Sequence, residues 1–96
     1  MPNGWVYEPT ISPYVALLFY NAMLRHYDFF SYTPVAVAKR EEIGTKYRYL
    51  CIAQARNAPD QDSLFACIEI YKPIAGMPYA TRLHRMSQDT WLNGLK

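Results

Sequence analysis

The hydrophobic pattern of this chain changes its period at Pro34, and this change constrains the fold more than any other feature. Before Pro34 one stripe recurs every three or four residues, as on one side of an α-helix: Val15, Leu18, Phe19, Ala22, Met23, His26 and Phe30. After Pro34, β-branched and aromatic residues gather in short runs between turn formers, which is typical of strands. The sequence therefore predicts an α+β fold in which an amphipathic helix precedes an antiparallel sheet.

Local signals give the bounds of the helix. Ser12 and Pro13 indicate its start, because the serine hydroxyl can accept a bond from a free amide and proline is tolerated in the first turn. Thr33-Pro34 limits its other end, because a residue before proline avoids helical backbone. We predict a helix over residues 13–29, and a short C-terminal helical turn beginning at Ser87.

Four later segments have the composition of strands. They are residues 34–40, 46–56, 64–72 and 79–86. Turn formers separate them, with Gly44 in the first connection and an Asn, Pro and Asp-rich loop at 57–63 in the second. We expect one domain over residues 1–96, with the helix packed on a three- to four-stranded antiparallel sheet or a small partly open barrel.

Composition excludes several classes of protein. Of the 96 residues, 51% are hydrophobic and 19% charged, which suits a packed core and not a disordered chain. The longest charge-free run, residues 9–24, is too short for a membrane span and contains two prolines. We expect a cytoplasmic protein, inside a host cell, because the sequence has no secretory signal pattern and only two cysteines.

The hairpin of residues 46–56 and 64–72 predicts which side chains share a face. If Cys51 pairs with Cys67, one face is aliphatic and suits the helix, carrying Leu50, Ile52, Ile68 and Ile70. The opposite face carries Tyr47, Tyr49, Glu69 and Tyr71. Three uses of this tyrosine face remain open, namely closure against other strands as a barrel, a homodimer seam, or the binding of a partner.

Basic residues follow the end of the predicted sheet. Arg82 and His84 share one face of strand 79–86, and Arg85 projects from the other. No acid lies between Lys72 and Asp89, so we expect both arginines to lack a local partner and to be free to meet an anion. The candidate binding residues are Tyr47, Tyr49, Glu69, Tyr71, Lys72, Arg82, His84 and Arg85.

The sequence has no recognisable catalytic, metal-binding or phosphate-loop motif. His26 and His84 have no ligand partners at metal-binding spacing, and the helix stripe assigns His26 to the core. Cys51 and Cys67 lie among apolar strand residues, a setting that does not activate a thiol. An enzyme using His84 and Glu69 as acid and base is the catalytic alternative, and no spacing supports it. We expect no metal and no cofactor.

Parts of residues 46–86 are similar to a known family. The segments Tyr49–Ala53 and Ile68–Gly76, followed by Arg82 and Met86, resemble an uncharacterised small β-domain family of bacteria and phages. The resemblance implies a compact sheet and no activity. In size and in its lack of catalytic groups the chain also resembles phage accessory proteins, including anti-CRISPR and other anti-defence inhibitors.

Two functions follow as hypotheses. The leading one is a non-catalytic, phage-type inhibitor that occupies a host protein or protein complex with its tyrosine and arginine surface. The alternative is a binder of nucleotides or nucleic acid, such as a sponge for a signalling nucleotide. In that alternative the basic residues meet phosphates while a tyrosine stacks on a base.

Overall fold

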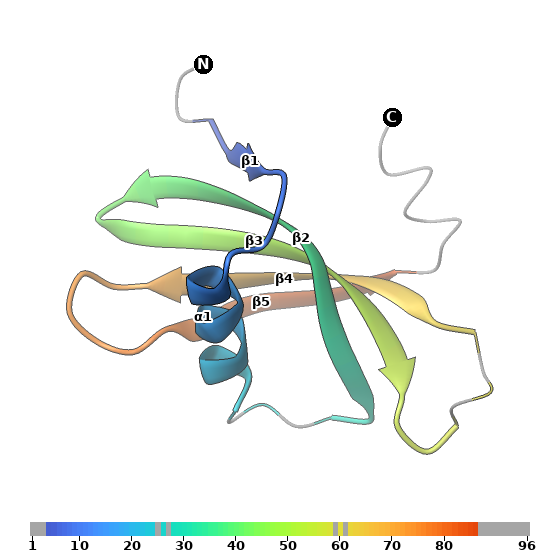
Figure 1. The fold of residues 1–96 in the computed structure, drawn as a ribbon. Helices are drawn as coiled ribbons and strands as arrows, with labels where there is room; N and C mark the ends of the chain where they lie inside the picture. Colours follow the sequence, from blue (N-terminus) through green and yellow to red (C-terminus); the bar gives the residue numbers. More distant parts are fainter. Residues whose placement is uncertain (1–3, 25, 27, 59, 61, 87–96) are drawn as a thin grey trace.

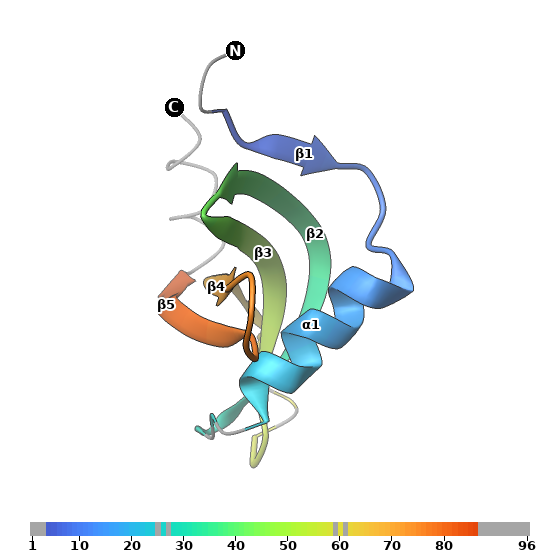
Figure 2. The ribbon, with the colours of Figure 1, turned by 90° about the vertical axis from the view of Figure 1, so that its left-hand side faces the viewer.

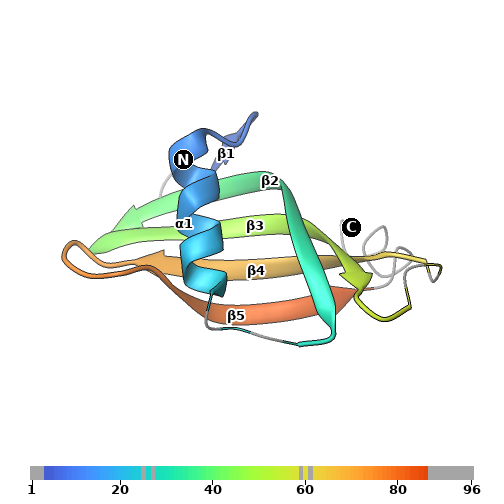
Figure 3. The same ribbon diagram turned by 60° about the horizontal axis from the view of Figure 1, so that its bottom comes forward.

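In the part of the chain that the structure describes, the fold is a five-stranded antiparallel sheet with one helix (Figure 1). The computed structural model describes residues 4–24, 26, 28–58, 60 and 62–86. The strands, in both chain and sheet order, are β1 (Val6–Glu8), β2 (Phe30–Glu42), β3 (Gly44–Ala55), β4 (Leu64–Lys72) and β5 (Tyr79–Met86). The helix is α1 (Pro13–Met23), and it lies across one side of the sheet (Figures 2 and 3).

The expected three- to four-stranded sheet or small barrel with a helix as its first element is wrong. β1 precedes α1 and pairs with β2, Tyr7 lying opposite Ala38, so the sheet has a fifth strand. A strand of three residues is too short to show the alternation by which strands are detected in a sequence. β1 and β5 are the two edges of the sheet, which is open.

α1 begins where the sequence predicts and ends earlier. The amide of Val15 donates to the Ser12 side chain at 3.3 Å, and Pro13 occupies the first turn. The helix ends at Met23 instead of residue 29, and Asp28 takes part in the turn that follows. The Phe30 amide donates to Oδ1 of Asp28 at 2.8 Å, a bond that competes with continued helix.

The strands β4 and β5 have the predicted bounds, whereas β2 is longer than the predicted 34–40. β3 begins and ends slightly before the predicted 46–56. The β2–β3 register shifts between Pro34 and Ala36, and such a bulge bends a strand. Figure 3 shows this bend, through which the first part of β2 turns toward β5.

The register of β3 and β4 differs by one residue from the prediction. Cys51 pairs with Ala66, and Cys67 pairs with Leu50. Because side chains alternate, this slip moves Tyr47 and Tyr49 onto the same face as Ile68 and Ile70. That face packs on α1 and forms the core, whose buried residues are Leu18, Phe19, Ala22, Val37, Tyr47, Tyr49, Cys51, Ala53, Ala66, Ile68 and Ile70. We call it the helix face and the opposite one the outer face.

Tyr49 explains why the core accepts tyrosine. Its ring centroid lies 4.9 Å from that of Phe19, and its hydroxyl donates to the Val15 carbonyl at 2.7 Å. The polar tip is therefore satisfied inside an apolar layer.

Two further predictions concern the ends of the chain and its location. The predicted helical turn from Ser87 lies outside the described residues. Within the part of the chain that the structure describes, no helix has the length and apolarity to cross a membrane.

Candidate functional site

The outer face has no covering helix among the described residues. The strand pairing places on it Tyr7, Ala36, Ala38, Arg40, Lys46, Arg48, Leu50, Ile52, Cys67, Glu69, Tyr71, Arg82 and His84. A groove of about 350 Å³ runs over its middle, lined chiefly by Tyr7, Ala36, Ala38, Arg48, Leu50 and Cys67. The two alanines leave space beside larger neighbours, so this central groove has an apolar floor.

Arg48 forms one wall of the central groove and is held from two sides. Its Nη2 and Nε donate to Oε2 of Glu69 at 2.8 and 3.2 Å. Its guanidinium carbon lies 4.1 Å from the centroid of the Trp5 ring, which is a cation–π contact. Arg48 is therefore a fixed charge, and Glu69 is neutralised by it.

A second groove, of about 680 Å³, lies beside the turn between β2 and β3. Its lining residues are Glu42, Ile43, Lys46, Glu69, Tyr71, Tyr79, Thr81 and Arg82. The rings of Tyr71 and Tyr79 meet edge to face with centroids 5.8 Å apart, and the Tyr71 hydroxyl donates to the Ile43 carbonyl. Gly44 allows the β2–β3 turn to approach the end of β4. Its φ is +88°, and a Cβ there would lie 2.6 Å from the backbone oxygen of Lys72. We call this site the turn groove.

The charges of the turn groove are unequally paired. Glu69 is bound to Arg48, and Glu42 lies 3.0 Å from Nε of Arg40, so both carboxylates are neutralised from outside the groove. Lys46 and Arg82 take part in no ion pair within the described ranges. Counting only the described residues, the groove therefore carries two positive charges without an ion-pair partner.

The structure separates the eight residues predicted for the site. Glu69, Tyr71 and Arg82 line the turn groove, and His84 is exposed on the same face opposite Cys67. Lys72 donates from Nζ to the Pro73 carbonyl at 2.8 Å.

The predicted tyrosine face does not exist as a surface. Tyr47 and Tyr49 are only 6% and 0% exposed, because the register slip places them under α1. Burial raises the pKa of both phenols above their ordinary value. Of the four residues assigned to that face, only Glu69 and Tyr71 lie on the outer face, so the predicted homodimer seam loses its two central tyrosines.

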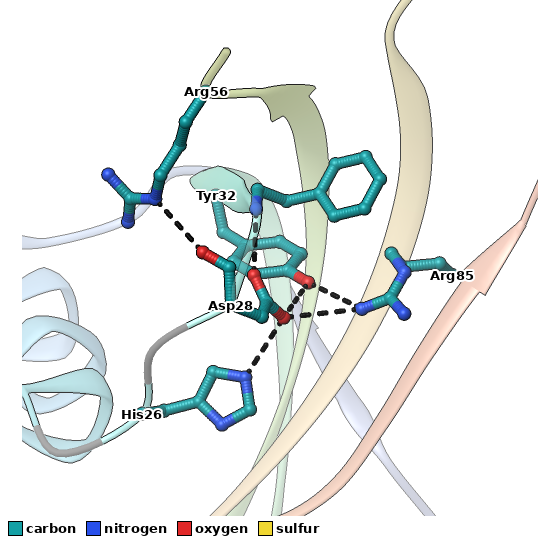
Figure 4. A network of polar contacts seen from close by, with 6 residues as sticks. His26, Asp28, Tyr32, Arg56 and Arg85 are labelled. Carbon is teal, nitrogen blue, oxygen red and sulfur yellow. Dashed lines mark hydrogen bonds and ion pairs between the residues drawn. The ribbon is translucent and has the colours of Figure 1, made fainter.

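Arg85 projects to the helix face, opposite to Arg82 and His84 as the alternation predicted. It belongs to a polar cluster that the sequence did not reveal (Figure 4). Oδ2 of Asp28 accepts from Tyr32 at 2.7 Å, His26 at 3.1 Å and Arg85 at 3.2 Å. Arg85 also donates to the Tyr32 hydroxyl at 2.9 Å. The expectation that Arg85 has no acidic partner is wrong, because its partner lies 57 positions away.

Two members of the Asp28 cluster, Asp28 and Tyr32, have shifted pKa values. Partial burial raises the pKa of Asp28, but hydrogen bonds from the Phe30 amide, Tyr32 and His26 outweigh it, so that pKa lies below the ordinary 3.8. Burial and the bond to Asp28 raise the pKa of Tyr32 to about 12. His26 is part of this cluster with 38% of its side chain exposed, which corrects its assignment to the core. The cluster joins the segment before β2 to β5 on the helix side.

Two chemical tests bear on a catalytic or metal site. Burial raises the pKa of the Cys67 thiol, and that of Cys51 to about 12, so neither free thiol ionises near neutral pH. Within the described ranges no hydrogen bond joins His84 to Glu69, and no three His, Cys, Asp or Glu side chains are grouped to hold a metal ion. Among the described residues, this face carries an apolar groove, the Glu69-bound Arg48, and two cations, Lys46 and Arg82, that have no ion pair.

The fold and the site define a small antiparallel sheet protein with a helix on one face and an open, aromatic and basic second face. Neither a family model, nor a curated protein, nor a solved structure matches this chain.

Proposed function

We propose that this chain is a non-catalytic binding protein that contacts a protein partner through its outer face. The observation that carries the proposal is the central groove, an apolar depression between Tyr7 and Arg48 with no helix over it in the described part. Protein interfaces typically combine an apolar centre with aromatic and arginine residues, as this face does.

The rigidity of Arg48 supports the same function. The contacts to Glu69 and Trp5 hold its side chain before any partner arrives, so less conformational entropy is lost on binding. We infer a partner that inserts an apolar side chain into the central groove and places a polar or acidic group beside Arg48.

The narrower hypothesis of a phage-type inhibitor belongs to this class. An inhibitor of this kind acts by occupying its target, and a preformed surface suits occupation without chemistry. Because the tyrosine face is not a surface, we assign this role to Tyr7, Trp5, Arg48, Leu50 and their neighbours on the outer face.

Photo-crosslinking from two matched tyrosine positions tests the proposal. Tyr7 on the outer face is 66% exposed, and Tyr14 on α1 is 57% exposed. A photoreactive phenylalanine analogue at position 7, in the source cell, is expected to give one saturable protein adduct, and the same analogue at position 14 none. An adduct from position 14 and none from position 7 would assign binding to the helix side instead.

A further inference from the structure

We propose that the turn groove is a nucleotide-binding site, in which Lys46 and Arg82 hold a phosphate group and Tyr79 stacks on the base. The site lies beside the central groove and does not depend on the protein partner proposed above.

The part of the site that would contact the phosphate consists of two cations on the strands that flank β4. Lys46 of β3 lies opposite Tyr71, and Arg82 of β5 lies opposite Glu69 on the other side of the same strand. Neighbouring strands are about 4.8 Å apart, so the two backbones are separated by roughly 10 Å. Two long basic side chains bridge that distance readily with a phosphate between them.

The sign of the ligand charge follows from the pairing of the acids. Glu69 and Glu42 are each bound by an arginine, Arg48 and Arg40 respectively, and so do not balance Lys46 and Arg82. An incoming anion therefore meets two cations that have no ion pair to give up within the described ranges.

The two tyrosines of the turn groove form the part of the site that would contact the base. Tyr79 is 52% exposed, and the edge-to-face contact with Tyr71 holds its ring beside the cations. Exposed aromatic rings of this kind stack on bases. Both bonds from Arg48 go to Oε2 of Glu69, so Oε1 is an acceptor with no other hydrogen bond in the described part. This oxygen suits an exocyclic amino group of a base.

Calorimetric titration at low salt tests the site with four defined ligands, namely adenosine monophosphate, adenosine, inorganic phosphate and a ten-residue oligodeoxyadenylate. We expect the monophosphate to bind at least tenfold more tightly than adenosine or phosphate alone, because only it engages both ends. Arg82→Ala, Lys46→Ala and Tyr79→Ala are each expected to weaken binding about tenfold. Lys39→Ala is the matched control, because Lys39 is on the helix face and already lies 3.9 Å from Glu8.

The oligonucleotide distinguishes between two kinds of ligand, a single-stranded nucleic acid and a free nucleotide. Tighter binding than the monophosphate, with a steep salt dependence, assigns the site to a single strand, and equal affinity assigns it to a free nucleotide. The proposal is overturned if neither adenosine monophosphate nor the oligonucleotide binds at millimolar concentration. It is also overturned if Arg82→Ala and Lys46→Ala, still folded by circular dichroism, bind the monophosphate as well as wild type does. The crosslinking result at position 7 does not depend on nucleotide binding, so the failure of one proposal can be told apart from the failure of the other.

Discussion

Phe19→Ala is expected to lower the free energy of unfolding by about 3–5 kcal/mol, the range for truncating a buried phenylalanine. Phe19 is 1% exposed and packs its ring on Tyr49, so it carries the contact between α1 and the helix face. Urea denaturation followed by circular dichroism measures the change, and an unaltered m value shows that the unfolding transition is otherwise the same.

Tyr20→Ala is the matched control for this prediction. Tyr20 adjoins Phe19 edge to face with centroids 5.2 Å apart, but it is 51% exposed. Its truncation is expected to cost less than about 1 kcal/mol. Equal and small losses for the two variants would contradict a core formed between α1 and the sheet.

Asp28→Ala is expected to lower the free energy of unfolding by about 2–3 kcal/mol, because Arg85 and Tyr32 lose their shared acceptor. Asp28→Asn keeps the size of the side chain and is expected to cost less. Glu41→Ala is the control, since Glu41 is a largely exposed carboxylate 3.9 Å from Lys39 and should change stability by less than about 0.5 kcal/mol.

The same cluster predicts a pH dependence. The pKa of Asp28 is lower in the folded protein than its ordinary 3.8, so ionised Asp28 stabilises the fold. That contribution is complete above the ordinary pKa and is lost as the pH falls through the lowered one. The stability difference between wild type and Asp28→Asn should therefore shrink as the pH falls below 3.8. A difference that grows on acidification would contradict the cluster.

Local signals predicted part of this fold correctly. The Ser12-Pro13 start of α1 depends on capping within one turn, and the bounds of β4 and β5 depend on turn formers beside them. Such signals act over a few residues and are legible in a single sequence.

The register of β3 and β4 was not predictable in the same way. Within β3, Leu50 and Ile52 share a face with Arg48, so alternation within that strand does not choose between a pairing of Cys51 with Cys67 and one with Ala66. The choice is made by α1, whose Phe19 packs on Tyr49. The candidate site changed with it, since two of its predicted tyrosines became core.

The Asp28 cluster was missed for a related reason. Arg85 is far from Asp28 in the chain, and the predicted helix over residues 13–29 placed Asp28 on a helix instead of before a strand. A strand that begins at Phe30 puts Tyr32 on the same face as that residue, two positions on. Recognising that strand would have ended the predicted helix before Phe30 and placed Asp28 just before β2, four positions from Tyr32.

The most direct test of the outer face as the binding surface uses the partner that position 7 crosslinks. It compares how strongly that partner binds variants at two leucines. Leu50 lies in the central groove, and Leu17 is 57% exposed on the solvent side of α1. The measurement is the Kd of that partner for wild type, Leu50→Glu and Leu17→Glu, each checked for folding by circular dichroism. We expect Leu50→Glu to weaken binding at least tenfold, about 1.4 kcal/mol, and Leu17→Glu to leave it unchanged. Loss of binding in Leu17→Glu with full affinity in Leu50→Glu would contradict this expectation.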